Sequence, residues 1–270
     1  MPSLPPIDAT LQLDFESAFH VGTGRAEGLA NRTVKRTASG APYVPASALK
    51  GALRETAERL IRRLDQRAVQ LEVGPERFLG YRRRGKEVVP ERCEAPRPEN
   101  MCKSTDPCIV CRVFGNALSG RRLIVDDARP MDKVPERSSG ANEKEDTGDM
   151  TRHRTQHGIE TYTQLRMDRR RRGARAGALF TSEQARPTRL RSRLSGRLPL
   201  TPLPEGPPAE LVLLAATLAA TEQIGGGASA GRGQCHVQVA GEGIQAGGDS
   251  YEASVLVQSI EPLADHLLFA

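Results

Sequence analysis

The chain has 270 residues, which allows one domain with large insertions or two small domains. Aromatic residues make up only 4% and tryptophan is absent, which excludes a core built on aromatic side chains and leaves an aliphatic one. Lys and Arg outnumber Asp and Glu by 39 to 33, so a polyanionic partner and a basic protein without one fit the charge about equally well.

The amino terminus lacks the apolar stretch of a signal peptide, and the longest apolar run, residues 211–220, is too short to span a bilayer. We therefore expect a soluble, cytoplasmic protein without a membrane partner. The five cysteines are then expected to be reduced, so clustered cysteines indicate a metal site in preference to disulfides.

The first half of the chain begins with alternating apolar and polar residues at 11–19, which predict a strand with one buried face. A Gly-rich, basic loop follows. Residues 46–64 predict an amphipathic helix with Ser47 as its N-cap. Its apolar face comprises Leu49, Leu53, Leu60, Ile61 and Leu64. Residues 66–111 are irregular, and residues 121–129 predict a central strand.

The second half returns to strand-like alternation after a polar excursion at 131–160. Residues 161–180 alternate around a basic turn, residues 189–203 predict another strand, and residues 208–223 predict a helix buried on all sides. A glycine loop and a last strand at 234–241 follow. This order predicts an α+β fold with the ferredoxin-like (RRM-like) βαββαβ pattern and no internal repeat.

Four cysteines lie close together in the irregular segment and end in a C-x-x-C pair. They are Cys93, Cys102, Cys108 and Cys111. Four thiolates in one short segment are typical of a tetrahedral structural zinc site, which has no open position for chemistry. Reduced thiols without metal are the alternative. Cys235, in the last predicted strand, is expected to be a core residue.

The glycine loop IGGGASAGRG at 224–233 fits neither a P-loop nor a dinucleotide fingerprint, because a helix precedes it and a strand follows it. It is suited to lie against an extended nucleic-acid backbone, with Arg232 beside it. A plain helix-to-strand connection is the alternative.

Lys50 and Arg54 lie near the amino end of the first helix, where a cation is unfavourable unless an anion is brought there. A solvated charged face is the alternative.

Catalytic candidates are few. His20 and Asp168 lack a partner residue that would indicate catalysis. Asp126 and Asp127 are adjacent in a predicted strand, so they point to opposite faces and do not share a metal ion.

Four segments, taken in order, resemble the RAMP proteins, the RNA-binding subunits of CRISPR effector complexes. GAPYVPASALKGALRE at 40–55 is similar to their pyIPGSSLKGxxR segment. CIVCRVFGNALSGRRLIVDDAR at 108–129 resembles a segment of their type III backbone subunits. RMDRRRRGARAGALFTSE at 166–183 resembles the stretch after their thumb, and GGGASAGRGQCHV at 225–237 resembles the GGxxSxGxG loop before their last strand.

The resemblance implies a single domain over residues 1–270, a palm that grips guide RNA (crRNA), and copies that stack along that RNA with other type III subunits. It also implies a thumb hairpin at 131–160 that separates guide from target RNA, besides the zinc-bearing insertion at 66–115. The residues implied to contact RNA are Ser47, Lys50, Arg54, Arg169, Gly225, Gly226, Gly227, Ser229 and Arg232. Such recognition reads shape and phosphates, and base pairing supplies the sequence.

One position departs from the family pattern. Active members cut target RNA with an aspartate and a divalent ion, and NRTVKRTASGAPYVP at 31–45 places Asn31 where that aspartate belongs. An amide neither accepts a proton nor binds a divalent ion as a carboxylate does. We therefore expect RNA binding with weak or absent cleavage. The alternatives are an endoribonuclease that uses Glu27 or Asp168, metal-free processing by His20, and a zinc-dependent interaction module without RNA.

Overall fold

The structure is a computed structural model. It describes residues 4–24, 32–70, 82–84, 87–89, 93, 102, 107–118, 120–131, 152–154, 158–168, 170, 172–204 and 206–269. Most of the predicted insertion (66–115) and thumb (131–160) lies outside these residues.

The main sheet has the strand order β13-β12-β1-β11-β6, and β7 also pairs with β11. Its strands are β1 (Pro6–Phe15), β6 (Leu123–Val125), β7 (Arg129–Pro130), β11 (Arg189–Arg197), β12 (Cys235–Ala246) and β13 (Asp249–Tyr251). All of the pairings are antiparallel. The central strand β1 is therefore held by two strands from the far end of the chain.

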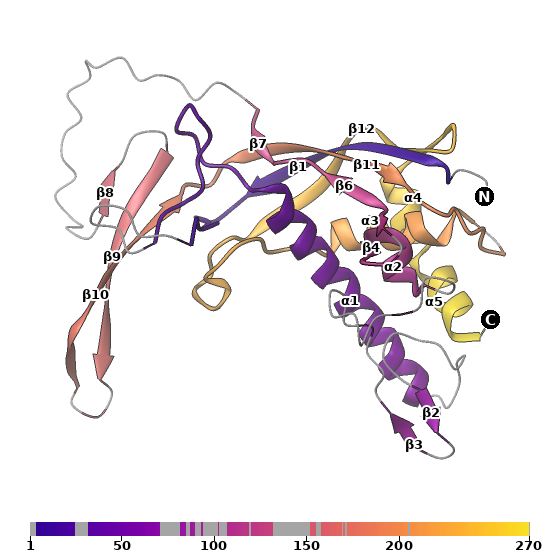
Figure 1. The fold of residues 1–270 in the computed structure, drawn as a ribbon, viewed down its shortest axis with the longest axis horizontal. Helices are drawn as coiled ribbons and strands as arrows, with labels where there is room; N and C mark the ends of the chain where they lie inside the picture. The colour runs from indigo at the N-terminus through magenta and orange to yellow at the C-terminus, as the bar shows by residue number, and fades with distance from the viewer. Residues whose placement is uncertain are drawn as a thin grey trace.

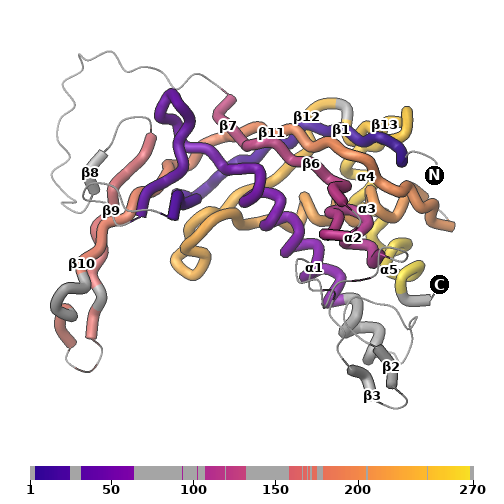
Figure 2. Tube along the Cα trace, in the orientation of Figure 1, coloured from indigo at the N-terminus to yellow at the C-terminus, as the bar shows by residue number. Residues whose placement is uncertain are grey.

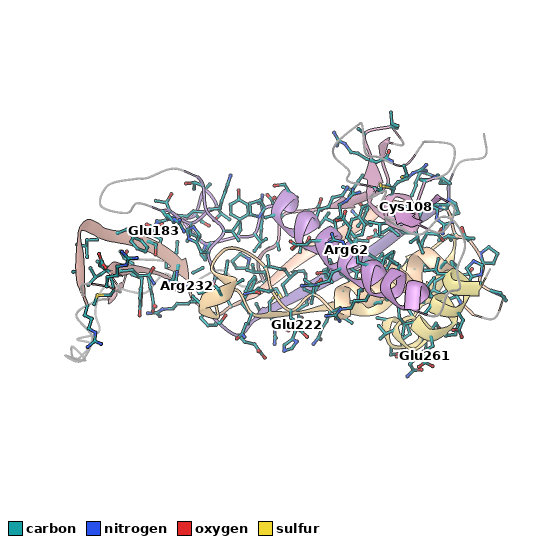
Figure 3. The ribbon with its side chains drawn as sticks, turned by 90° about the horizontal axis from the view of Figure 1, so that it is seen from below. Arg62, Cys108, Glu183, Glu222, Arg232 and Glu261 are labelled. Carbon is teal, nitrogen blue, oxygen red and sulfur yellow. The ribbon has the colours of Figure 1, made fainter. Side chains whose placement is uncertain are left out.

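The helices lie on one side of the main sheet (Figures 1 and 3). They are α1 (Ala46–Gln70), α2 (Ile109–Phe114), α3 (Ala209–Ala219), α4 (Ala253–Gln258) and α5 (Ile260–Phe269). Among the described helices, none combines the length and the apolar character that crossing a membrane requires. The described chain begins and ends at the same end of the molecule (Figure 2).

The core forms where the sheet meets the helices. Alternate residues of β1 and β11, among them Leu11, Leu13 and Leu190, are fully buried. Nearly every residue of α3 is buried as well, which confirms the prediction of an apolar helix inside the fold. The buried residues are mostly Leu, Val, Ile and Ala, which confirms the predicted aliphatic core. Each buried leucine contributes about 1.5–3 kcal/mol relative to an exposed one.

The opposite face of the main sheet is open and polar. Arg193 pairs with Asp8 and Arg189 pairs with Asp14 across the β1–β11 ladder. These ion pairs lower the pKa of both carboxyls. For Asp8 the largest effect on the pKa is the hydrogen bond from Arg193. For Asp14 the largest single effect is desolvation, which raises the pKa, but the hydrogen bonds from Arg189 and Gln12 and the charge of Arg189 together outweigh it.

A second sheet projects away from the main sheet as a long hairpin (Figure 1). It consists of β9 (Ile159–Asp168) and β10 (Gly173–Ala185), with β8 (Arg152–Arg154) beside β9. Leu165 and Leu179 are cross-strand partners, and both are exposed. The hairpin confirms the predicted strands around a basic turn.

Two short ribbons complete the described strands. They are β2 (Arg82–Arg84) with β3 (Glu87–Val89), and β4 (Gly115–Asn116) with β5 (Gly120–Arg121).

Three predictions about the strands were wrong. The first strand is β1 at Pro6–Phe15, several residues earlier than predicted. The predicted central strand at 121–129 is broken, and its longest piece, β6, lies at the edge of the main sheet beside β11 alone. The predicted last strand continues as β12 to Ala246, and β13, α4 and α5 follow it.

The N-cap prediction was also wrong. Helix α1 begins at Ala46, so Ser47 lies inside the first turn and is exposed. The backbone N–H of Ala46 donates instead to Asp127 Oδ1 at 2.9 Å. This bond is the largest effect on the pKa of Asp127, which it lowers. A carboxylate from a distant segment therefore supplies the negative charge that a helix amino end favours.

Candidate metal centre and RNA-binding surface

The four clustered cysteines come together in the structure. Their sulfur atoms all lie within 4.8 Å of one another. The Sγ atoms of Cys93 and Cys111 are 3.5 Å apart, and those of Cys102 and Cys108 are 3.8 Å apart. These residues could hold a metal ion, as the spacing of the cysteines predicts.

The start of α2 and two backbone amides fix the positions of the sulfurs. Cys108 lies just before α2 and Cys111 lies in its first turn, so the C-x-x-C spacing puts both on the same side of the helix. The N–H groups of Cys102 and Cys108 donate to the sulfurs of Cys93 and Cys102, each at 3.4 Å. Such donors favour thiolates, which are the form that binds metal.

Crowding four thiols together separates their pKa values. A bond from Cys102 lowers the pKa of Cys93, and a bond from Cys108 lowers the pKa of Cys102 to about 6. Bonding to Cys102 raises the pKa of both Cys108 and Cys111, because they keep their protons while their neighbours are ionised. The four sulfurs therefore titrate as one unit.

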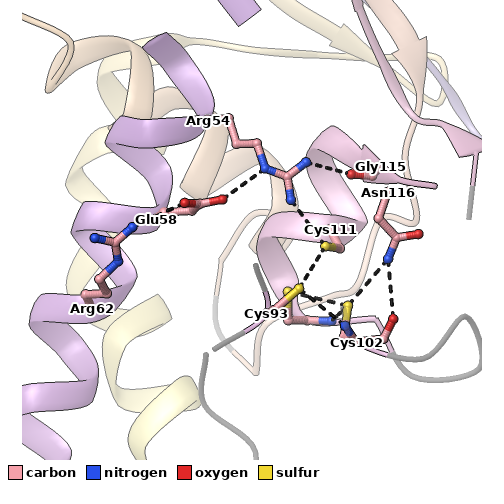
Figure 4. Close-up of polar contacts among 9 residues, drawn as sticks. Arg54, Glu58, Arg62, Cys93, Cys102, Cys111, Gly115 and Asn116 are labelled. Atoms are coloured by element: carbon pink, nitrogen blue, oxygen red, sulfur yellow. Dashed lines mark hydrogen bonds and ion pairs between the residues drawn. The ribbon is translucent and has the colours of Figure 1, made fainter. Parts of the chain in front are cut away.

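Two side chains outside the cysteine segment also reach the sulfurs (Figure 4). Arg54, on α1, donates from Nη2 to Cys111 Sγ at 3.5 Å. Asn116, on β4, donates from Nδ2 to Cys102 Sγ at 3.5 Å. The sequence did not indicate the contact of Arg54, because α1 and the cysteines are far apart in the chain.

The glycine loop lies at the surface, on the segment that follows β1. Residues 225–231 are all exposed, and Ala228–Ala230 form a single 3-10 turn. The N–H of Gly226 donates to the carbonyl of His20 at 2.8 Å, and that of Gly233 donates to the carbonyl of Ala18 at 2.9 Å. The exposed backbone is therefore held at both ends.

Four of the five loop glycines have a positive φ, and at two of them a side chain would also collide with the backbone. Gly225 has a φ of +99°, and a Cβ there would lie 2.7 Å from the His20 carbonyl oxygen. Gly233 has a φ of +76°, and its Cβ would lie 2.3 Å from the Ile224 carbonyl oxygen. Gly226 differs, because a Cβ at this position meets no atom closer than 3.8 Å. A side chain therefore fits at Gly226 but not at Gly225 or Gly233.

Arg232 joins the loop to the base of the β9–β10 hairpin. Its guanidinium carbon lies 5.7 Å from the centroid of the Tyr162 ring, within cation–π range. With its amide turned so that the oxygen faces the arginine, Gln184 accepts from Nη2 of Arg232 at 2.9 Å. Figure 3 shows Arg232 and Glu183 at the end of the molecule from which the β9–β10 hairpin projects. The loop and the hairpin therefore form one continuous surface.

The two basic residues of α1 that were predicted to contact RNA bind different parts of the protein. Lys50 donates from Nζ to the carbonyl of Leu123 at 2.5 Å, and burial, followed by Arg54 and Arg121, lowers its pKa. Arg54 points to the cysteine cluster. Burial, the largest single effect, works against its charge, but the hydrogen bonds and charges of Glu58 and Cys111 together outweigh it and raise its pKa. The RNA contacts of Ser47, Lys50 and Arg54 stay predictions.

The catalytic candidates occupy ordinary structural positions where they are described. His20 Nδ1 is 2.8 Å from the carbonyl oxygen of Glu183, and Asp168 Oδ1 accepts from the N–H of Arg170 at 2.9 Å. Asn31, Glu27 and Arg169 lie outside the described residues.

Glu183 is a buried residue that sequence reasoning missed. Its carboxylate accepts from Arg36 Nη2 at 2.6 Å and from the N–H of Val34 at 3.0 Å. The signal in the sequence for this buried carboxylate is weak, because it consists of one glutamate within the predicted strand. Its bonds attach the basic loop after β1 to the base of the β9–β10 hairpin.

Known proteins resemble this chain in sequence and in structure. The cryo-EM structure of the type III-B Cmr-beta complex bound to cognate target RNA contains a similar chain, with 12% identity and a TM-score of 0.49, covering 86% of this chain and 96% of that one. No curated protein matches. The sequence model described as the RAMP superfamily matches residues 12–236, which is most of the chain. The chain belongs to the RAMP superfamily.

Proposed function

We propose that this protein is a guide-RNA-binding backbone subunit of a type III CRISPR effector complex that acts in antiviral defence. Its partners are crRNA, target RNA, and other subunits, including copies or homologues of itself, in the cytoplasm. The observation that carries the proposal is the exposed glycine loop, which is held on the segment after β1 and continues into Arg232 and the hairpin.

The loop suits a phosphate backbone for a physical reason. Its exposed residues are Gly, Ala and Ser, with little or no side chain, so a polynucleotide can approach the backbone closely. Arg232 adds a cation at one end, and the chain as a whole carries a net charge of +6. Contacts of this kind position an RNA without reading its sequence, and base pairing then provides specificity.

The strand order supports a ferredoxin-like palm. With α1 and α3 as the two crossover helices, β1, β6, β11 and β12 follow the βαββαβ order, and they lie side by side as β12-β1-β11-β6. The projecting β9–β10 hairpin then extends the proposed thumb beyond 131–160, towards the end of β10.

Zinc is the metal that the cysteine cluster fits best. Zn–S bonds of about 2.3 Å in a tetrahedron place sulfurs about 3.8 Å apart. The sulfur pairs at 3.5 and 3.8 Å match this value. When bound, zinc stabilises the insertion, and with four thiolate ligands it has no position for a water or a substrate.

RNA retention tests the proposal directly. The protein is expressed with a CRISPR array and its partner subunits, purified, and the retained RNA is sequenced. We expect RNA of guide length that carries repeat sequence. If no RNA remains even when partner subunits are present, the RNA-binding proposal is wrong, and the metal-bearing insertion becomes a protein-docking module.

A variant of the glycine loop tests where RNA binds. Gly226→Asp adds a negative charge at a position with room for a side chain. We expect the affinity for guide RNA, measured by fluorescence anisotropy, to fall about tenfold, equivalent to about 1.4 kcal/mol, with an unchanged melting temperature.

The control places the same charge elsewhere. Val255→Asp, on the exposed face of α4, is expected to leave the affinity for guide RNA unchanged. Equal losses in both variants would show a general charge effect, and no loss in Gly226→Asp would remove the loop from the RNA interface.

Cleavage provides a separate prediction. Because Asn31 stands where the family aspartate is expected, we expect the assembled complex to cut target RNA weakly or not at all in Mg²⁺ or Mn²⁺. Asn31→Asp is expected to increase the divalent-dependent rate. Strong cutting by the wild type that persists in Asn31→Ala would favour an active endoribonuclease with a different carboxylate.

A further inference from the structure

Arg54 was expected to contact RNA, and its guanidinium lies against α2 and β4 (Figure 4). Nε bonds to Glu58 Oε1 and Nη1 donates to the carbonyl of Gly115, both at 2.9 Å. Nη2 donates to Cys111 Sγ at 3.5 Å. Each of the three nitrogens thus has a partner within the protein.

The cysteine cluster needs such a cation. Four thiolates and one divalent ion carry a net charge of −2, and Cys111 is fully buried. A buried charge is costly unless it is paired or hydrogen-bonded. Of the described cations, Arg54 is the one with a bond to a cluster sulfur. Arg112 lies next to Cys111 on α2, but it bonds to Thr201 and pairs with Glu210.

The position of Arg54 is itself fixed. Glu58 lies one turn further along α1 and holds Arg54 through Nε, and Arg62 pairs with the second oxygen of Glu58 at 3.2 Å. Asn116 acts in parallel at Cys102, with a neutral amide. The arginine, by contrast, contributes charge as well as a hydrogen bond.

We propose that Arg54 is a positioning residue of the metal centre, which it ties to α1 by offsetting the charge of the thiolates and orienting Cys111. The proposal rests on the zinc site proposed above and does not depend on RNA binding. Partners that orient metal ligands typically change metal affinity by about 10–100-fold when they are removed.

The experiment measures Zn²⁺ affinity by chelator competition on the full chain. We expect Arg54→Met to bind Zn²⁺ about 10–100-fold more weakly, and Arg54→Lys, which keeps the charge, to recover part of the loss. In Co²⁺-loaded protein, Arg54→Met is expected to move the sulfur-to-cobalt charge-transfer band to longer wavelength. A thiolate without its hydrogen bond is a better electron donor.

The matched control is Arg62→Met. It removes a cation that contacts the same Glu58 but is more exposed, and that bonds to no other residue in the described part of the chain. We expect it to leave Zn²⁺ affinity and the cobalt spectrum unchanged. Wild-type affinity and spectrum in Arg54→Met would overturn the proposal. A loss of RNA binding in Arg54→Met with normal metal binding would overturn it too, and a wild type that binds no metal would instead refute the zinc site.

Discussion

Cys108→Ser is expected to abolish stoichiometric metal binding, because a serine hydroxyl is a far weaker zinc ligand than a thiolate. Metal content, measured by mass spectrometry of the purified protein, should fall from one ion per chain to about zero. Structural zinc sites provide about 10–16 kcal/mol of apparent binding free energy in small zinc-finger peptides. Here the loss of the metal is expected to destabilise the whole fold, because Val110, Val113 and Phe114 of α2 belong to the same buried core as the main sheet.

The fifth cysteine supplies the control. Cys235 is buried in β12, away from the cluster, and burial raises its pKa to about 12. Cys235→Ala should therefore keep one ion per chain. An ion that persists in Cys108→Ser, or a loss in both variants, would contradict a metal centre formed by the four clustered sulfurs.

Glu210→Ala is expected to cost about 3 kcal/mol of unfolding free energy, at the low end of the range for breaking a buried ion pair. Glu210 is fully buried at the start of α3. Its carboxylate accepts from the N–H and the hydroxyl of Thr201, at 2.8 and 2.9 Å, and lies 3.2 Å from Arg112 Nε. The low end applies because the Arg112 side chain keeps 26% exposure and hence some water. Urea unfolding measures the change.

Glu55→Ala is the matched control, because Glu55 is exposed on α1 and surface substitutions change stability by less than about 0.5 kcal/mol. The double variant Arg112→Leu with Glu210→Leu should lose less than Glu210→Ala, because no charge is left unpaired. If Glu210→Ala matches the control, the ion pair between α2 and α3 does not stabilise the fold.

Patterns within a short stretch of sequence predicted the features that depend only on residues close together in the chain. The strand β11, the helix α3 and the clustering of the four cysteines each have a signal within a few positions, and the structure contains all three, although β11 ends at Arg197 and not at 203 as predicted. The sequence also shows that Glu210 is a charged residue in the apolar segment of α3, but it does not show how that charge is accommodated. Glu210 is buried only because Arg112 and Thr201 approach from other segments.

Contacts between distant segments explain the predictions that failed. Ser47 has the right chemistry for an N-cap, yet Asp127 arrives from 81 residues away and accepts the Ala46 N–H. Arg54 lies at a charged position of an amphipathic helix, and only the packing of α2 on α1 turns it towards Cys111. Helix periodicity identifies the exposed side of a helix in isolation, and it contains no information about a second helix that covers that side.

The central position of β1 also sets the order in which the chain can fold as it leaves the ribosome. Asp14 pairs with Arg189, and Phe15 pairs with Cys235, so β1 emerges long before either neighbouring strand exists. At about 5–20 residues per second, β1 waits on the order of 10 to 35 seconds for β11. Its apolar residues are exposed to chaperones and to other nascent chains for that time. Domain-wide folding is therefore expected to begin only after β11 has been synthesised, and shorter amino-terminal fragments are expected to aggregate.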